Sequence, residues 1–213
     1  MKKIALLFSI ILFIGCSNSS RLLQKSPDKS LVLKIHFNDG LLFYSLSKNK
    51  KLIIQNSKLG IITDQFKFSD SLIVKDIQKN SHKEIWTQIW GEQKEVLDYH
   101  NEIAVTVFSK KTNNQMIIRF RLFNDGLGFR YEIPKQSGID KFNILDELTE
   151  FNFSEDSPSW WIPAYAYRRY EFLYANTLIS EINRDTYSEL VEYLNGPRIG
   201  PEAVQTPFTV QRD

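Results

Sequence analysis

Strict alternation of large apolar side chains in two separated segments is the strongest constraint on this fold. In residues 31–37 every second side chain is large and apolar, and the same period recurs in residues 116–122. A period of two places these side chains on one face of an extended strand, so each segment predicts a β-strand with one buried face. No segment keeps the i, i+3, i+4 apolar spacing of a helix over three turns, and only residues 188–194 are compatible with a short helix.

The turn residues support this β-rich interpretation. Asn38-Asp39-Gly40 and Asn124-Asp125-Gly126 each stand between two apolar runs. Asp-Gly in this position predicts a tight hairpin whose two central residues both have φ > 0. Further strand-like runs cover residues 52–54, 59–62, 72–74 and 103–108. Many short strands joined by polar turns predict an all-β sandwich.

The N-terminus predicts export. Lys2 and Lys3 precede an uncharged apolar run over residues 4–14, which is too short for a permanent membrane-spanning helix. We therefore expect residues 1–15 to be a lipoprotein signal peptide, Cys16 to carry the lipid, and residues 16–25 to form a polar tether. This places the protein in the periplasm or on the outer membrane of a bacterium, with the lipid as its only contact with the membrane. An ordinary signal peptide with an incidental cysteine is the alternative.

The charge balance excludes one class of partner. Two of the 27 basic residues and none of the 25 acidic residues lie in residues 1–15, so the processed chain is close to neutral. Binding to nucleic acid requires a basic surface, and we expect none here. The 42% apolar content and the remaining length suit one globular domain over residues 26–213.

No set of residues forms a recognisable catalytic centre. The three histidines, His36, His82 and His100, lie in different segments without metal-ligand spacing, and the single cysteine leaves no thiol for catalysis. Isolated histidines of this kind are typical of surface or hydrogen-bonded core positions.

Two aromatic clusters are compatible with a carbohydrate site. Trp86 begins the first cluster, residues 86–92, and Trp161 lies in the second, residues 160–174. Aromatic rings next to carboxylates and amides can stack on a sugar and hold its hydroxyl groups. Packing in the core of the sandwich is the alternative, and the residue types alone favour it. Within the second cluster, Glu171 requires a partner if it is buried, either an arginine such as Arg168 or Arg169, or a metal ion.

The order of the motifs resembles the N-terminal domain of glycoside hydrolase family 97, a bacterial family of α-glucosidases and α-galactosidases. The matching stretches are residues 26–28, 86–95, 101–105, 118–132, 161–163, 170–171, 180–182 and 204–208. The resemblance implies a β-super-sandwich of the galactose-mutarotase-like kind, followed in the complete enzyme by a (β/α)₈ barrel and a C-terminal β domain.

The resemblance also implies site residues. It assigns Glu171 as a ligand of a Ca²⁺ ion whose other ligands belong to the barrel, and it places Glu192 near an α-linked oligosaccharide substrate. Trp86 and Trp161, from the two aromatic clusters, are the further candidate substrate contacts. A carboxylate is the usual anionic ligand of Ca²⁺, which takes six to eight oxygens, so Glu171 needs further ligands.

A (β/α)₈ barrel takes ~250 residues, and this sequence ends at Asp213. We therefore expect the sandwich to be incomplete at its C-terminus and the chain to be inactive alone, since the catalytic carboxylates of the family lie in the barrel. Two alternatives remain: a free-standing carbohydrate-binding lipoprotein, and an interaction domain that docks other envelope proteins.

Overall fold

The computed structural model describes residues 22–164, 173–183 and 203–212. Within these ranges nearly all regular structure is antiparallel β-sheet, which confirms the predicted all-β class. No helix in the described part of the chain has the length and apolar character needed to cross a membrane. The chain divides into two compact units, Met1–Asn152 and Phe153–Asp213.

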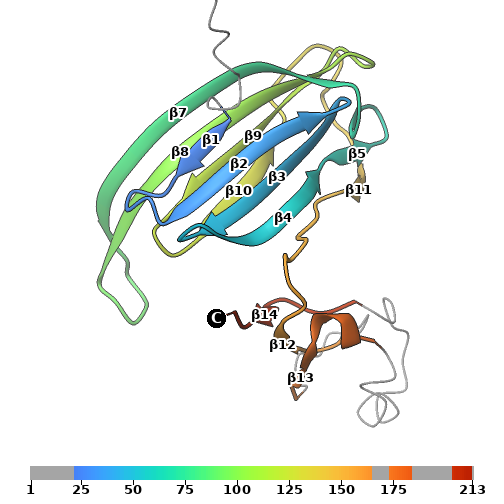
Figure 1. Ribbon diagram of the computed structural model, residues 1–213. Helices are drawn as coiled ribbons and strands as arrows, with labels where there is room; N and C mark the ends of the chain where they lie inside the picture. The colour runs from blue at the N-terminus through green and yellow to red at the C-terminus, as the bar shows by residue number, and fades with distance from the viewer. Residues whose placement is uncertain (1–21, 165–172, 184–202, 213) are drawn as a thin grey trace, which may run out of the picture. The chain divides into compact units, whose positions relative to one another are not determined.

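The first unit contains two four-stranded sheets that lie face to face (Figure 1). In spatial order, the strands of the first sheet are β1 (Leu23–Lys25), β2 (Leu31–Asn38), β3 (Leu41–Lys48) and β4 (Lys51–Leu59). Those of the second sheet are β10 (Leu127–Glu132), β9 (Gln115–Leu122), β8 (Glu95–Ser109) and β7 (Leu72–Thr87). A small third sheet contains β11 (Ile144–Glu147), β5 (Ile61–Thr63) and β6 (Lys67–Phe68).

The core of this unit is made by the side chains that alternate along the strands. On β9, Met116, Ile118, Phe120 and Leu122 are completely buried. From the facing sheet, the ring of Tyr44 packs 6.2 Å from that of Phe120. Burying large apolar side chains is the main favourable term in folding, so the predicted period-two segments become the paired inner faces of the sandwich.

The β7–β8 hairpin is longer than the sequence predicts. The strands pair from Leu72 with Ser109 to Thr87 with Glu95, with one irregularity between Val74 and Asp76. The predicted runs 72–74 and 103–108 cover only the buried end. From residue 79 onward the side chains of β7 are exposed on both faces, and pairing with β8 continues the strand without an apolar period. The apolar alternation in the sequence therefore predicts only the buried part of this hairpin.

The two Asn-Asp-Gly turns differ. Asp39 and Gly40 have φ of 49° and 77°, as predicted for the tight hairpin between β2 and β3. The prediction is wrong for the second turn, where Asp125 and Gly126 lie outside the positive-φ region. Here Phe123 to Gly126 form a four-residue connection, in which the N–H of Phe123 donates to the carbonyl of Gly126 (2.8 Å).

A tertiary contact explains the altered turn. The side-chain oxygen of Asn124 accepts a hydrogen bond from the N–H of Asp28 (3.0 Å). Asp28 in turn accepts a bond from the hydroxyl of buried Ser26 (2.6 Å), and this bond lowers the pKa of the Asp28 carboxyl. The asparagine thus bonds to a distant turn.

The second unit has a three-stranded sheet with β12 (Pro158–Trp161) between β13 (Ala175–Leu178) and β14 (Thr209–Val210). A 3₁₀ turn, η2 (Ile179–Glu181), follows β13. Trp161 is the buried centre of this unit, packed against the partly buried Ala175, Ile182, Val204 and Phe208.

The two glycines of the Asn-Asp-Gly turns provide a matched pair of substitutions. In Gly40→Ala, the new Cβ would lie 2.8 Å from the backbone nitrogen of Ser71, at a φ that disfavours side chains. We expect the free energy of unfolding to fall by about 2 kcal/mol or more. In Gly126→Ala, nothing lies within 4 Å of the new Cβ, so we expect no loss and up to about 1 kcal/mol of gain. Urea unfolding of both variants checks this, and equal losses would contradict the difference between the turns.

Candidate functional site

Polar side chains cover the face of the second sheet that points away from the core. Because side chains alternate along a strand, the residues of β8 and β9 that lie between the buried apolar ones project to this outer face. They include His100 and Glu102 on β8 and Arg119 and Arg121 on β9. The register places Arg121 opposite Glu102.

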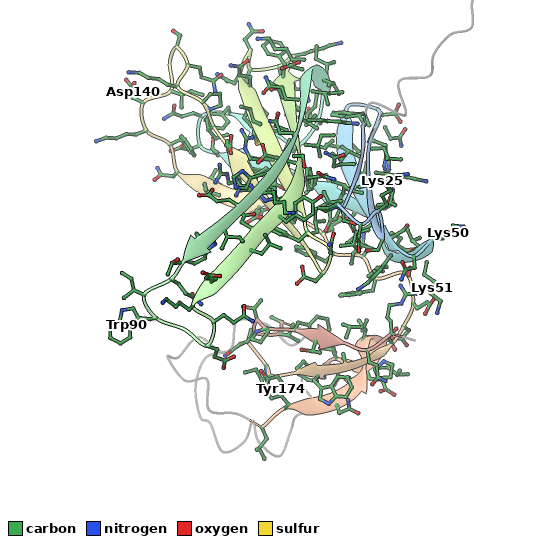
Figure 2. All side chains as sticks on the ribbon, turned by 90° about the vertical axis from the view of Figure 1, so that its left-hand side faces the viewer. Lys25, Lys50, Lys51, Trp90, Asp140 and Tyr174 are labelled. Atoms are coloured by element: carbon green, nitrogen blue, oxygen red, sulfur yellow. The ribbon has the colours of Figure 1, made fainter. Side chains whose placement is uncertain are left out.

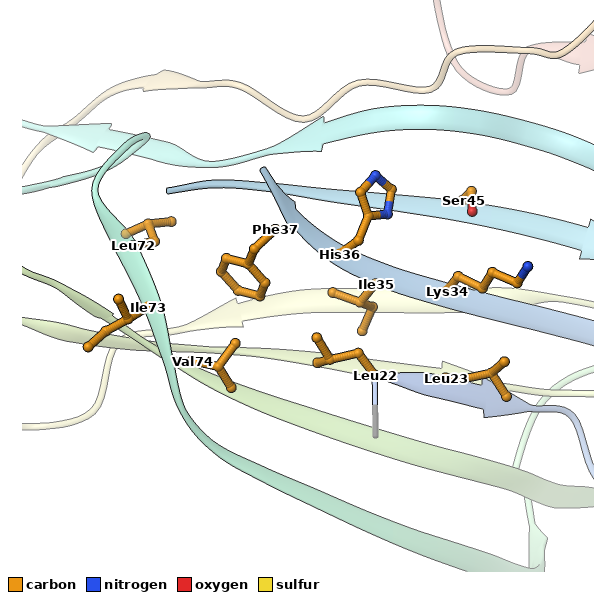
Figure 3. Close-up of a pocket in the computed structure, with 10 residues that line it drawn as sticks. All are labelled: Leu22, Leu23, Lys34, Ile35, His36, Phe37, Ser45, Leu72, Ile73 and Val74. Carbon is orange, nitrogen blue, oxygen red and sulfur yellow. The ribbon is translucent and has the colours of Figure 1, made fainter. Parts of the chain in front are cut away.

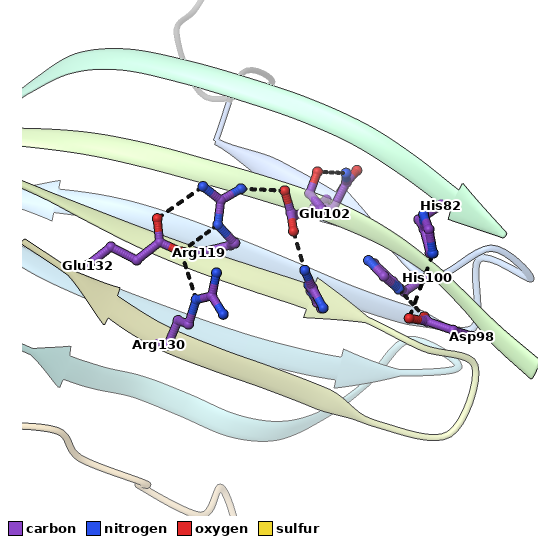
Figure 4. Close-up of polar contacts among 9 residues, drawn as sticks. His82, Asp98, His100, Glu102, Arg119, Arg130 and Glu132 are labelled. Carbon is purple, nitrogen blue, oxygen red and sulfur yellow. Dashed lines mark hydrogen bonds and ion pairs between the residues drawn. The ribbon is translucent and has the colours of Figure 1, made fainter. Parts of the chain in front are cut away.

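A five-residue ion network crosses three strands of this outer face (Figure 4). Glu102 accepts from Arg119 Nη1 at 2.5 Å and from Arg121 Nε at 3.0 Å. Arg119 also binds Glu132 in a bidentate way, at 2.7 and 3.0 Å, and Arg130 Nε lies 2.7 Å from the same carboxylate. Arg119 therefore bridges two glutamates, an arrangement with well-defined geometry.

The network keeps its carboxylates ionised. Hydrogen bonds from Arg119, and more weakly from Arg130, lower the pKa of Glu132 to about 2 in spite of partial burial. Burial alone would raise the pKa of Glu102, but the hydrogen bonds of Arg121 and Arg119 outweigh it and lower that pKa. The hydrogen bonds that Arg119 donates to Glu132, and less strongly to Glu102, raise the pKa of Arg119. All of these groups are charged at neutral pH.

A pair of histidines stands next to the network. His82 on β7 lies directly opposite His100 on β8, with ring centroids 5.1 Å apart. Asp98 Oδ1 lies 2.5 Å from His100 Nδ1, and Asp98 Oδ2 lies 3.8 Å from His82 Nε2. Glu84 Oε2 lies 3.3 Å from the same His82 nitrogen. The ring of His100 is nearly buried, with an exposed side-chain fraction of 3%, and Phe123 packs 5.1 Å from it.

A polar cavity of about 280 Å³ opens beside these groups. The residues that line it belong to adjacent positions on three strands: Asn80, Ser81, His82, Asp98, His100, Glu102 and Arg121. Carboxylates, amides, imidazoles and a guanidinium group together offer both donors and acceptors. Its size is close to the lower end of the roughly 300–1,000 Å³ found for small-molecule sites.

A larger hollow of about 960 Å³ lies between β2 and β7 and has a different character (Figure 3). Its lining is mainly apolar, with Leu22, Ile35, Phe37, Leu72 and Val74 among the contributing side chains. A ligand site needs a few polar groups that converge on one point, in addition to apolar walls. Its polar residues are Lys34, His36 and Ser45, on neighbouring positions of β2 and β3. The outer-face cavity is lined entirely by polar and charged residues, so we take it as the candidate functional site.

Comparison with known proteins identifies the family. The family described as glycosyl-hydrolase 97 N-terminal matches residues 24–213. The chain belongs to this family. A family 97 glycoside hydrolase from Pseudoalteromonas sp. strain K8, solved in complex with panose, is 33% identical with a TM-score of 0.75. The same alignment covers 89% of this chain and 26% of that chain, so this chain spans about a quarter of its relative.

Two further solved structures are similar. The Pseudoalteromonas enzyme in complex with acarbose is 34% identical over the same shares of the two chains, also with a TM-score of 0.75. A β-arabinopyranosidase, at 24% identity and a TM-score of 0.69, shares the fold over 75% of this chain and 27% of its own. The resemblance to family 97 stated from the motifs is thus confirmed.

The predicted site residues of this family 97 domain have different environments in the structure. Trp86 lies on β7, with an exposed fraction of 46%, and shares the outer face with His82. Trp161 is only 1% exposed, and its Nε1 donates to Thr177 Oγ1 (3.0 Å), so here its ring packs in the core of the second unit. Glu171, Glu192 and Cys16 lie outside the described residues. The sugar contacts and the lipid attachment stay predictions.

The calcium site also stays a prediction, because its ligand Glu171 is outside the described residues. In the described ranges no group of three His, Cys, Asp or Glu side chains could hold a metal ion.

Sequence reasoning missed the cluster around His82 and His100. The two histidines lie 18 positions apart, and only the register of the β7–β8 hairpin brings them together. The signal was local to each strand: His82 precedes Glu84 by two positions and His100 follows Asp98 by two, so each pair shares a face.

The lowered pKa of Glu132 predicts an acid-dependent stability. A carboxyl whose pKa is lower in the folded state stabilises the fold above its unfolded pKa, and this contribution is lost as the pH falls toward the folded value. We expect Glu132→Gln to reduce the free energy of unfolding at pH 7 by on the order of 1–2 kcal/mol, allowing for solvent screening. The difference from the parent protein should shrink as the pH falls from about 5 and vanish only below pH 2.

Denaturant unfolding across this pH range measures the effect. Glu95→Gln, at an exposed position on β8, is the matched control and should change the stability little at any pH. A Glu132→Gln difference that stayed constant from pH 7 to pH 2 would contradict the assignment.

Proposed function

We propose that this chain acts as the N-terminal domain of an α-glycoside hydrolase and supplies carbohydrate contacts to it. The observation that carries the proposal is family membership over residues 24–213, with 33% identity to an enzyme solved in complex with panose. Because the match covers only 26% of that relative, we assign cleavage of the glycosidic bond to the part of the enzyme that this chain does not match.

The chemistry of the outer face supports this division. Most glycosidases use two carboxyl groups, one of which stays protonated as a general acid by means of a raised pKa. Glu102 and Glu132 have lowered pKa values and are bonded to arginines, so neither is suited to donate a proton. The same face presents hydrogen-bonding groups and exposed Trp86, which suit recognition of a sugar.

The remaining parts of the proposal rest on the resemblance. Glu171 would supply one carboxylate to a Ca²⁺ ion shared with the rest of the enzyme, and Glu192 would approach the substrate. A lipid on Cys16 would hold the enzyme in the bacterial envelope, where oligosaccharides enter.

An activity assay tests the division of roles. The purified chain should release no product from aryl α-glucosides or aryl α-galactosides, with or without millimolar Ca²⁺, because the acid and base are elsewhere. It should bind panose detectably by isothermal titration calorimetry. Calcium-dependent turnover by the chain would contradict the proposal.

A free-standing carbohydrate-binding lipoprotein is the second candidate, and the exposure of Trp86 favours it. A protein selected to bind alone should hold panose with micromolar affinity, whereas a domain that only completes a larger site should bind it weakly. The affinity measured in the same titration separates the two.

A further inference from the structure

We propose that the polar cavity on the outer face, together with Trp86, is a binding site for an α-linked oligosaccharide. The cavity would hold the hydroxyl groups of one sugar residue, and the indole would stack on another. This inference rests on the proposed function and locates carbohydrate recognition on β7, β8 and β9.

The strand register supports a single continuous site. Asn80, His82, Glu84 and Trp86 occupy alternate positions of β7, and their partners on β8 are Glu102, His100, Asp98 and Val96. All of these side chains therefore share one face of the sheet. His82 and Trp86 are four positions apart, which is roughly 13 Å at the rise of a β-strand. An oligosaccharide that follows β7 would span this length with more than one ring.

The cavity has a rigid, partly buried floor. Arg119 and Arg121 fix both oxygens of Glu102, and Asp98 fixes the ring of His100. Figure 4 shows the His100 ring between Asp98 and Glu102, in line with the ion network. Nδ1 is the ring nitrogen that contacts Asp98, which leaves Nε2 on the other side of the ring. Among the described residues Nε2 has no hydrogen-bond partner, so it is available to a ligand that enters the cavity.

The charge pattern favours a neutral polyhydroxyl ligand over an ion. An anion near Arg121 would also meet Glu102 and Asp98, which line the same cavity. A metal ion lacks a suitable set of three ligands in the described part of the chain. A sugar hydroxyl both donates and accepts hydrogen bonds. The exposed amide of Asn80 can do both as well, and the ion-paired Glu102 beside it is an acceptor.

Trp86 supplies the apolar half of the site. Its indole is about half exposed, on the cavity side of the hairpin. An aromatic ring can cover the C–H face of a sugar while neighbouring polar groups hold its hydroxyls. Trp90 lies at the free end of the same hairpin with an exposed fraction of 86%, beyond the paired strands (Figure 2). A substitution of Trp90 is therefore the control for non-specific sugar binding by an exposed tryptophan.

Panose binding to three variants of the full chain tests the site. Asn80→Ala and Trp86→Ala each replace an exposed side chain, so both should fold with unfolding midpoints close to the parent value. We expect each to weaken panose binding at least tenfold in calorimetric titration. Trp90→Phe should bind like the parent. In ¹⁵N spectra of the parent, panose should shift the side-chain amide of Asn80 and the indole N–H of Trp86.

The possible failures are distinct. If the parent binds panose and both variants bind it equally well, the location is wrong while the proposed function stands. If Trp90→Phe weakens binding as much as Trp86→Ala, recognition belongs to the free end of the hairpin and the cavity assignment is overturned. If the parent itself binds no panose at tens of millimolar, both the site and the carbohydrate contribution of the domain are wrong.

Discussion

The register of β8 against its two neighbours determines what the outer face can do. Ile103, Val105 and Val107 are fully buried on one side of β8, and this fixes which side chains must point the other way. A slip of one residue would exchange the two faces, moving Glu102 into the core and a large apolar side chain into solvent. Hydrophobic burial on one side of a strand therefore positions the polar chemistry on the other side.

Glu102 connects the stability of the sheet with the cavity. Its carboxylate joins Arg119 and Arg121, and it also lines the polar cavity. A carboxylate that is held by two cations keeps its charge and its position, so a ligand would meet a fixed acceptor. Such preorganisation lowers the ordering cost of binding, because the side chain has already lost its freedom in the folded protein.

Short-range patterns predicted the sandwich, and long-range pairing produced the site. The alternation in residues 116–122 and the Asp39-Gly40 turn depend on neighbours in sequence, and the structure confirms both. The second Asn-Asp-Gly turn depends on Asn124 bonding to distant Asp28, which no local rule contains. His82 and His100 likewise meet only through the hairpin, along a stretch of β7 without apolar period. Trp161 packs in the core of the second unit, the role that its residue type favoured.

A crystal structure of the chain with panose tests whether the outer face of the second sheet binds carbohydrate. We predict density for a sugar ring stacked on the indole of Trp86, with hydroxyl groups within hydrogen-bond distance of Asn80 and Glu102. Panose seated elsewhere on the molecule, with an unoccupied outer face, would contradict the assignment of this face of the family 97 domain to carbohydrate recognition.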